Sequence, residues 1–131
     1  MKFFFDNCLP KRLAHAIAIL DNAHTVKHLQ DEYAANTPDL EWLEFLGTSH
    51  EWNVISCDAF NKTREEKEAI RRLARSTFIF AGGYANLPIW TQAYKIVQRW
   101  PEVLKAASTA RFGQVFRVHL SSCKVEDITL R

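Results

Sequence analysis

The hydrophobic and polar positions of this chain form short segments that alternate between two periodicities. Five apolar segments have the aromatic and β-branched composition of strands. They cover residues 2–5, 24–29, 53–57, 77–81 and 114–120. In the last of these, apolar side chains alternate with polar ones, a pattern that suits a strand at an edge of the sheet.

Four segments between these strands have helical spacing instead. Their apolar positions are Leu13, Ile17 and Leu20 after Pro10; Leu40, Trp42, Leu43 and Leu46 after Asp39; Ile70 and Leu73 within residues 62–75; and Trp90, Ala93, Tyr94 and Val97 after Pro88. Pro10 and Pro88 stand where their helices are expected to begin. Pro101 is expected to end or kink the last helix.

The alternation of strands and helices indicates the architecture. A β-α-β order repeated along the chain calls for a parallel or mostly parallel sheet with helices on both faces. The 131 residues suffice for one domain with a substantial core. We therefore expect one α/β domain over residues 1–131, a three-layer α/β/α arrangement with a mostly parallel central sheet.

The composition is that of an ordinary globular protein. Hydrophobic residues make up 47% and charged residues 24% of the chain. No apolar stretch approaches the ~20 residues of a membrane span. The N-terminus also lacks the order of a signal peptide, because Asp6 interrupts its apolar run. The three cysteines are few and odd in number, which argues against a disulfide framework. A cytoplasmic protein without membrane association is expected.

The net charge of +2 conceals an asymmetry along the chain. Residues 1–61 contain nine acids against four bases, which gives −5. Residues 62–131 contain thirteen bases against six acids, which gives +7. This division is consistent with a metal site or a polyanionic partner, although charge alone favours two differently solvated faces.

Carboxylates follow the strands at the points where an α/β sheet binds ligands. Asp6 and Asp58 each end a predicted strand, and Asp39 lies at a helix start together with Glu41 and Glu44. Several carboxylates in one pocket repel one another unless a cation neutralises them. Mg²⁺ or Mn²⁺ suits such an oxygen site. The arrangement favours phosphodiester hydrolysis, where metal ions activate water and stabilise the leaving oxygen.

Other interpretations of these positions remain open. A single aspartate after a strand is commonly a helix cap or a turn residue. Cys8 and Cys57 each lie beside a proposed acid, but free cysteine is usually a small buried apolar residue. His24 and His28 lie in a strand-like segment, where residues four apart are too distant to chelate a metal. Neither a zinc site nor a thiol nucleophile is predicted.

The segments KFFFDNCLP, HTVKHL, PDLEWL and VISCDAF follow in the order and spacing of bacterial PIN-like domains. The chain resembles that family over roughly its first 65 residues. The resemblance implies a PIN fold, Mg²⁺- or Mn²⁺-dependent ribonuclease activity, and a toxin role with a cognate antitoxin protein as partner. It also implies that Asp6, Asp39 and Asp58 are metal-binding catalytic acids. Ser56 corresponds to a threonine or serine near the metal water in the family.

Two positions depart from the family pattern. The acid that follows the first aspartate is Asn7 here, and the second acid of a D-x-D motif is Phe60, with Asn61 nearby. Fewer carboxylates would weaken a second metal site, so a one-metal or degenerate nuclease remains open. Asn7, Asn61 and Glu41 are auxiliary candidates. Glu41 is the weakest of them, because residues two apart on a helix do not face one point.

The predicted helix over residues 62–75 carries a basic stripe. Its members are Arg64, Lys67, Arg71 and Arg75. Such a stripe can track an RNA backbone, and it can also be a solvated face balanced by neighbouring glutamates. Single-stranded RNA would need stacking surfaces as well, for which Tyr84, Trp90 and Trp100 are available, although Trp90 has the spacing of a core residue.

Two functional hypotheses follow. The first is a metal-dependent endoribonuclease that acts on RNA, with Asp6, Asp39 and Asp58 as metal ligands. The second is a non-catalytic PIN-like module that binds RNA or a protein partner. A signalling receiver domain is disfavoured, because Gly-Gly-Tyr stands where such a domain would need a lysine. A homodimer also remains open.

Overall fold

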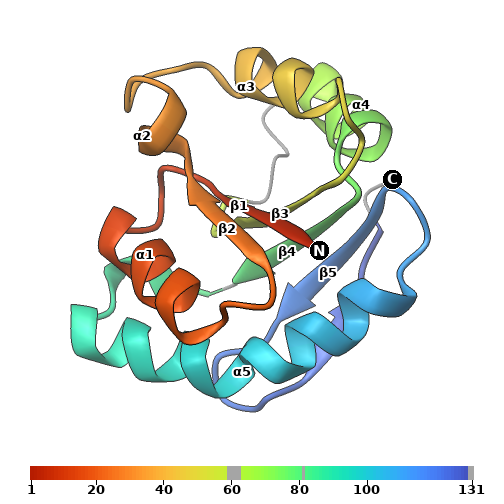
Figure 1. Ribbon diagram of the computed structural model, residues 1–131. Helices are drawn as coiled ribbons and strands as arrows, with labels where there is room; N and C mark the ends of the chain where they lie inside the picture. The colour runs from red at the N-terminus through yellow and green to blue at the C-terminus, as the bar shows by residue number, and fades with distance from the viewer. Residues whose placement is uncertain (59–62, 81, 130–131) are drawn as a thin grey trace.

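Six strands form one sheet, and helices cover both of its faces (Figure 1). The computed structural model describes residues 1–58, 63–80 and 82–129. The strands are β1 (Lys2–Phe5), β2 (Thr25–His28), β3 (Trp52–Ser56), β4 (Ser76–Phe80), β5 (Gln114–Val118) and β6 (Val125–Asp127). They lie in the order β2-β1-β3-β4-β5-β6, with β1 to β5 parallel and β6 antiparallel to β5. The expected α/β class with a mostly parallel central sheet is confirmed.

The sheet differs from the prediction at one edge. The alternating pattern of residues 114–120 predicts an edge strand, but β6 pairs with the outer side of β5 and takes the edge position. Just beyond β6, the backbone N–H of Ile128 donates to the carbonyl oxygen of Val115 at 2.9 Å. The three residues of β6 are too few to give a recognisable strand pattern.

The helices are α1 (Lys11–Leu20), α2 (Leu29–Glu32), α3 (Asp39–Leu46), α4 (Arg64–Leu73) and α5 (Ile89–Thr109), with a short 3-10 helix η1 (Tyr84–Asn86) before α5. Pro10, Pro38 and Pro88 are the N-cap residues of α1, α3 and α5, which confirms the predicted starts. Proline suits these positions because the first helical turn has no use for its missing N–H. No helix in the described part of the chain is long and apolar enough to cross a membrane.

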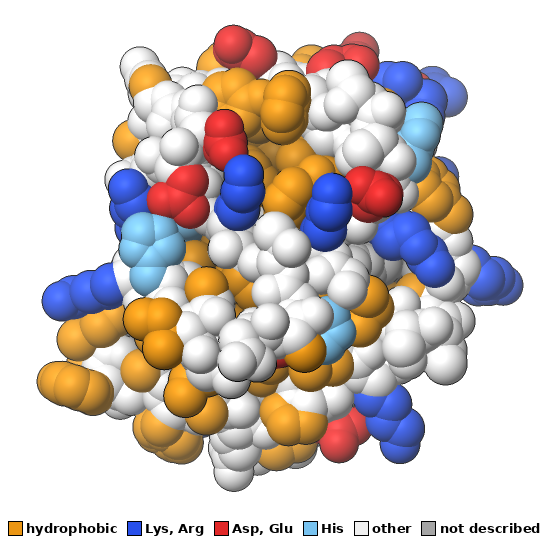
Figure 2. Space-filling view, viewed as in Figure 1, with side chains coloured by type: hydrophobic (Ala, Val, Ile, Leu, Met, Phe, Trp, Pro, Cys, Tyr) orange, Lys and Arg blue, Asp and Glu red, His pale blue; other side chains and the backbone are white. Residues whose placement is uncertain are grey.

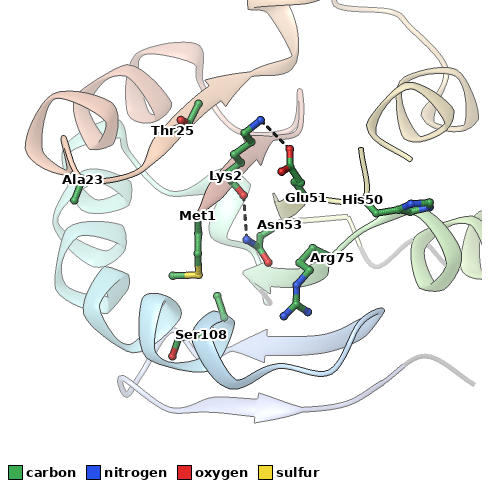
Figure 3. Close-up of a pocket in the computed structure, with 10 residues that line it drawn as sticks. Met1, Lys2, Ala23, Thr25, His50, Glu51, Asn53, Arg75 and Ser108 are labelled. Atoms are coloured by element: carbon green, nitrogen blue, oxygen red, sulfur yellow. Dashed lines mark hydrogen bonds and ion pairs between the residues drawn. The ribbon is translucent and has the colours of Figure 1, made fainter. Parts of the chain in front are cut away.

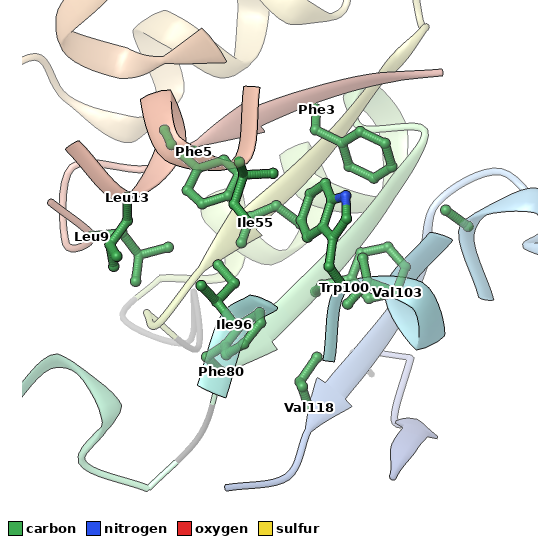
Figure 4. Packing of buried hydrophobic residues seen from close by; sticks show 14 of the residues in the cluster. Phe3, Phe5, Leu9, Leu13, Ile55, Phe80, Ile96, Trp100, Val103 and Val118 are labelled. Atoms are coloured by element: carbon green, nitrogen blue, oxygen red, sulfur yellow. The ribbon is translucent and has the colours of Figure 1, made fainter. Parts of the chain in front are cut away.

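The hydrophobic core has two halves, one on each face of the sheet. Helices α1 and α5 cover one face, and α3 and α4 cover the other (Figure 1). Successive aromatic residues of β1 serve both halves, because side chains alternate across a strand. Phe3 and Phe5 contact Trp100 of α5, as Figure 4 shows, whereas Phe4 stacks on Trp42 of α3 at 5.3 Å between ring centroids.

The buried face of α5 differs from the predicted one. The sequence places Trp90, Tyr94 and Val97 in the core, but they are exposed, with 84% of Trp90 accessible to solvent. Ile96, Trp100, Val103 and Ala107 are buried instead. Both stripes have helical spacing, so periodicity alone does not distinguish them. Figure 2 shows hydrophobic side chains on the surface over the region of α1 and α5.

The structure corrects two further expectations about helices: that Pro101 could end its helix, and that Leu20 lies on a buried face. Pro101 does not end its helix, since α5 continues to Thr109. The buried neighbours Trp100 and Val103 hold the helix on the sheet through this position. Leu20, expected on the buried face of α1, is 68% exposed because it is the last residue of the helix, beyond Ile17, the last buried residue of α1.

The connection from β4 to β5 has the opposite hand from the connections before it. The connections from β2 to β3, from β3 to β4 and from β4 to β5 all advance across the sheet in the same direction. The first two place α3 and α4 on one face, whereas the third places α5 on the opposite face. Such crossovers are rare. Here the position of α5 covers the apolar side chains of β4 and β5 that α1 does not reach, among them Phe80, Phe116 and Val118.

Candidate functional site

The candidate site lies at the carboxyl ends of β1 and β3. The chain leaves β1 toward β2 on one side and later crosses to β3 on the other, so the strand order switches between β1 and β3. Ligands of open α/β sheets bind at such a switch point. Asp6 directly follows β1, and its backbone N–H donates to the carbonyl oxygen of Ile55 at 2.9 Å. Asp58 follows β3 after one intervening residue. Both strand-end acids therefore occupy this end of the sheet.

Ser56 links the two acids. Its hydroxyl donates to Oδ2 of Asp6 at 2.9 Å, and its oxygen accepts the backbone N–H of Asp58 at 2.9 Å. The other oxygen of Asp6, Oδ1, accepts the backbone N–H of Asn7 at 2.6 Å. Ser56 is fully buried and Asp6 is 5% exposed, so the carboxylate is held in one orientation by fixed donors.

Burial makes Asp6 an unusual carboxylate. The pKa of Asp6 is raised from its ordinary value of 3.8 to about 6, mainly by loss of hydration. The Ser56 hydroxyl lowers this pKa, and the negative charges of Asp39 and Asp58 raise it further. Asp39, the first residue of α3, thus acts on the same carboxylate as Asp58 although it lies on a different element. The three acids share one electrostatic environment.

Asn7 supports the connection that leads to Asp39. Its side-chain nitrogen donates to the carbonyl oxygen of Ala35 at 2.8 Å, and its side-chain oxygen accepts from Nε2 of Gln30 at 2.5 Å. Asn7 therefore ties the segment between α2 and α3 to the end of β1. At the start of α3, Nε1 of Trp42 donates to Oδ1 of Asp39 at 3.2 Å. The auxiliary candidate Asn7 acts in the structure as a tether.

His28 ties the same region together from β2. Its ring is fully buried, with Nε2 at 2.6 Å from the carbonyl oxygen of Leu9 and Nδ1 accepting the backbone N–H of Gln30. Burial lowers the pKa of His28, so the ring is neutral at neutral pH. The sequence pattern excluded His28 as a metal ligand but did not reveal this role, because Leu9 lies in a distant turn.

The two cysteines beside the acids also lie together. Cys8 is exposed, contrary to the expectation of a buried apolar thiol, and Cys57 is partly exposed. The backbone N–H of Cys57 donates to Sγ of Cys8 at 3.0 Å, and Sγ of Cys57 donates to the carbonyl oxygen of Cys8 at 3.5 Å. Hydrogen bonding to Cys57 lowers the pKa of the Cys8 thiol, and the same contact raises the pKa of Cys57.

The three candidate acids offer the type of ligand atom that a hard divalent cation prefers. Asp6, Asp39 and Asp58 offer carboxylate oxygens, the preferred ligands of Mg²⁺ and Mn²⁺, and their mutual repulsion favours a cation. Among the residues that the structure describes, no three histidine, cysteine or acidic side chains are gathered closely enough to hold a metal. Mg²⁺ is commonly bound by one or two carboxylates, with water and substrate phosphate in the remaining positions.

The remaining auxiliary candidates are Glu41 and Asn61. Glu41 is exposed, and its charge acts on Tyr33, whose pKa is raised by burial, by Glu32 and then by Glu41. Asn61 and Phe60, the positions of the expected second acid, lie outside the described residues.

The four basic residues do not form one stripe. Arg64, Lys67 and Arg71 lie on α4, which runs from the carboxyl ends of the strands toward the amino ends. Arg64 is at the end nearer to the acids and pairs with Glu68 at 3.1 Å. Arg75 follows α4, and its guanidinium donates to the carbonyl oxygen of Ala110 at 3.1 Å. The sequence pattern overestimated the length of the helix and so included Arg75.

A cavity of about 630 Å³ opens at the opposite end of the sheet (Figure 3). Four of its polar side chains are engaged with one another or with the backbone. Lys2 pairs with Glu51 at 2.9 Å, Asn53 donates to the carbonyl oxygen of Lys2 at 3.0 Å, and Arg75 bonds the end of α5. None of the three candidate acids lines this cavity. The acids and the cavity are therefore separate features of the molecule.

Comparisons with known proteins identify the family. A family model described as a PIN like domain matches residues 1–82, more than half of the chain. The matched part includes β1 to β4 and all three candidate acids. Searches of curated proteins and of solved structures gave no match. From the matched residues, the chain belongs to the PIN-like domain family, which has a fold of the nuclease type.

Proposed function

We propose that this protein is a metal-dependent endoribonuclease in which Asp6, Asp39 and Asp58 hold Mg²⁺ or Mn²⁺. The observation that carries the proposal is the buried carboxylate of Asp6, whose pKa is raised to about 6 by burial and by the two neighbouring acids. Strongly perturbed carboxylates of this kind concentrate at functional sites. When bound, the ion would supply a water of lowered pKa and stabilise charge on the phosphate.

The other residues of the site have supporting roles in this proposal. Ser56 orients Asp6 through its hydroxyl, and Asn7 holds the connection to Asp39. Arg64 and Lys67 lie on the part of α4 nearer to the acids, where they would bind RNA phosphates. Arg75 bonds to Ala110 instead and is not part of this surface.

Cleavage of a mixed RNA pool with and without Mn²⁺ tests the activity. Asp6→Asn and Asp58→Asn should each reduce cleavage by at least about a hundredfold, because each removes a charge that would hold the ion. Glu102→Gln is the matched control, since Glu102 is an exposed acid on α5 outside the site. Folded variants that cut RNA as well as the wild type would contradict the assignment of these acids.

RNA binding without cleavage tests the role of α4. In the Asp6→Asn background, Arg64→Gln and Lys67→Gln should each reduce the slope of log affinity against log salt by about 1, because each removes one phosphate contact. Arg75→Gln should leave the slope unchanged, since the Arg75 guanidinium bonds to a carbonyl oxygen. An unchanged slope in the first two variants would exclude α4 as the RNA surface.

The second candidate is a PIN-like module that binds RNA or a protein without cutting. It is supported by Asn7, which replaces an acid of the family pattern and has both of its side-chain polar atoms engaged in hydrogen bonds. Titration with Mn²⁺ separates the two candidates. A binding module retains RNA but has no measurable affinity for Mn²⁺, whereas the nuclease binds the ion through Asp6.

A toxin role with a cognate antitoxin protein and a cytoplasmic location belong to the same proposal. Their support is the family itself. Expression of the wild type should arrest growth of a bacterial host, and Asp6→Asn should relieve the arrest. Co-expression of the product of an adjacent gene should also relieve it if that product is the antitoxin. Sedimentation of the purified protein would decide between a monomer and the homodimer that the sequence left open.

A further inference from the structure

Cys8 and Cys57 form a reciprocal contact that the proposed mechanism does not use. They are 49 positions apart in the sequence: Cys57 directly follows β3, and Cys8 lies in the turn after β1, the strand that pairs with β3. Each residue donates to the other: the Cys57 backbone N–H to Sγ of Cys8 at 3.0 Å, and Sγ of Cys57 to the Cys8 carbonyl oxygen at 3.5 Å. Each sulfur therefore lies against the backbone of the other residue, the proximity that a disulfide requires.

The two thiols differ in their access to solvent. Cys8 is exposed in the turn between β1 and α1, whereas Cys57 is only partly exposed. Sγ of Cys8 also lies 3.5 Å from Oγ of Ser56 and 4.0 Å from Oδ2 of Asp6. A reagent from solvent would thus reach Cys8 first, and Cys57 is placed to react with the product. Cys123, the third cysteine, is exposed in the turn before β6 and lies on another part of the fold.

We propose that Cys8 is a site of oxidation by hydroperoxides and that Cys57 resolves the product to a Cys8–Cys57 disulfide. In the first step Sγ of Cys8 attacks one peroxide oxygen, an S–O bond forms, the O–O bond breaks, and an alcohol or water leaves. Cys8 is then a sulfenic acid, oxidised by two electrons. In the second step Sγ of Cys57 attacks this sulfur, the S–S bond forms, and the S–O bond breaks with release of water. In total, two thiols and one hydroperoxide give a disulfide, water and an alcohol or a second water.

The disulfide would act on the candidate site because its two ends adjoin the acids. Cys57 precedes Asp58 directly, and Cys8 lies in the turn that begins at Asp6. The bridge withdraws Sγ of Cys8 from the Cys57 N–H and fixes the spacing of the two strand ends. Because the bridge would fix the spacing of the chain segments that carry Asp6 and Asp58, the oxidised protein should bind Mn²⁺ about tenfold more weakly. This second step rests on the proposed function, whereas disulfide formation does not.

The test treats the folded chain with a stoichiometric amount of hydrogen peroxide and measures its intact mass, free thiols and tryptic peptides. The wild type should lose two hydrogens, retain one free thiol on Cys123, and yield a peptide that joins Cys8 to Cys57. Cys57→Ser should stop at a sulfenic acid on Cys8 that a dimedone probe captures. Cys8→Ser should give neither product, and Cys123→Ser should behave as the wild type. Dithiothreitol should restore both thiols.

Thermal unfolding provides an independent readout. A bridge that closes a loop of this length should raise the unfolding midpoint by roughly 5–15 °C, and Cys57→Ser should show no such rise. A sulfinic acid on Cys8 without a bridge, or a bridge that involves Cys123, would overturn the proposal. If the bridge forms and Mn²⁺ affinity is unchanged, the coupling to the site is wrong. If the reduced protein binds no Mn²⁺, the proposed function fails and the thiol result stands.

Discussion

Asp6 is a carboxylate that the fold holds at a cost in stability. Its side chain is 5% exposed, and burial is the main reason that its pKa rises to about 6. In the unfolded chain the pKa returns to its ordinary value of 3.8. Between these two values the folded state binds more protons than the unfolded state, so stability falls as pH rises from about 4 to about 6. Above that range the full cost remains.

Asp6→Asn should therefore increase the free energy of unfolding at pH 7.5 by about 1–3 kcal/mol in the absence of metal. The gain should disappear near pH 3, below both pKa values, where folded and unfolded Asp6 are both largely protonated. Urea unfolding at the two pH values measures this difference. Glu102→Gln, which changes an exposed acid, should give no pH-dependent gain. A loss of stability in Asp6→Asn at pH 7.5 would mean that hydrogen bonds from Ser56 and Asn7 outweigh burial.

The sequence was sufficient to place two of the acids at strand ends, but it did not predict the contacts that surround them. Asp6 and Asp58 could be placed because each ends an apolar strand, a feature that is local in sequence. The tether from Asn7 to Ala35 and the contact between Cys8 and Cys57 join residues 28 and 49 positions apart. No local pattern specifies such contacts, because they arise when the strands pair. Asn7 stands where the family pattern has an acid. The structure gives its side chain a different role, because it donates to the carbonyl oxygen of Ala35.

The Asn7 tether predicts a local change in dynamics. Asn7→Ala removes the side-chain bonds to Ala35 and Gln30, so opening of residues 33–38 should become easier by about 1–2 kcal/mol. Amide hydrogen exchange in this segment should accelerate by roughly tenfold, while exchange in the strands should change little. Asn36→Ala, at an exposed asparagine in the same segment, is the control. Equal acceleration in both variants would exclude a specific role for Asn7.

Among the elements, α5 shows where periodicity is insufficient. Two of its faces carry aromatic or aliphatic residues at helical spacing, and the sheet buries the one that contains Trp100. Trp100 contacts Phe3 and Phe5, and its Nε1 donates to Oδ2 of Asp21 at 2.7 Å. These partners lie at the opposite end of the sequence. The start of the helix at Pro88 was predictable because capping is local, whereas its orientation depends on tertiary contacts.

Substitution of two tryptophans on α5 distinguishes its faces. Trp100→Ala should lower the free energy of unfolding by about 3–5 kcal/mol, because it opens a cavity between α5 and β1 and removes the indole donor to Asp21, which keeps its contact with His24. Trp90→Ser should change this free energy by less than about 0.5 kcal/mol, since Trp90 is 84% exposed. Chemical denaturation measures both values. A large loss for Trp90→Ser would show that a partner or a second copy covers this face in solution.

At the scale of the molecule, the topology determines where chemistry can occur. The sequence correctly predicted a mostly parallel α/β sheet, because strand-like and helix-like segments alternate. It did not predict the strand order or the face that α5 covers, which depend on how the crossovers pack. The resulting order places the ends of β1 and β3 side by side. Asp6 and Asp58 come to lie at the same end of the sheet for that reason, although most of the matched family segment separates them in sequence.

A cation bound at this site should stabilise the whole fold in a pH-dependent manner. At a Mn²⁺ concentration of about 100 times the dissociation constant, the free energy of unfolding should rise by about 2.7 kcal/mol at pH 7.5. At pH 5 the proton competes with the ion, because the pKa of Asp6 is about 6. The affinity should then fall by about tenfold, and the stabilisation by about 1.4 kcal/mol. Thermal or urea unfolding with and without Mn²⁺ at the two pH values measures both quantities.

The variants make this last prediction specific to the carboxylates. Asp6→Asn should abolish the stabilisation by Mn²⁺ at both pH values, while Glu102→Gln should retain it. Mn²⁺ and the removal of the charge should then both raise the free energy of unfolding, but in different proteins: the wild type gains stability from Mn²⁺, and the variant gains it from the loss of the buried carboxylate. Equal stabilisation of wild type and Asp6→Asn would mean that Mn²⁺ binds elsewhere. Stabilisation that grows at pH 5 would exclude ionised carboxylates as the ligands.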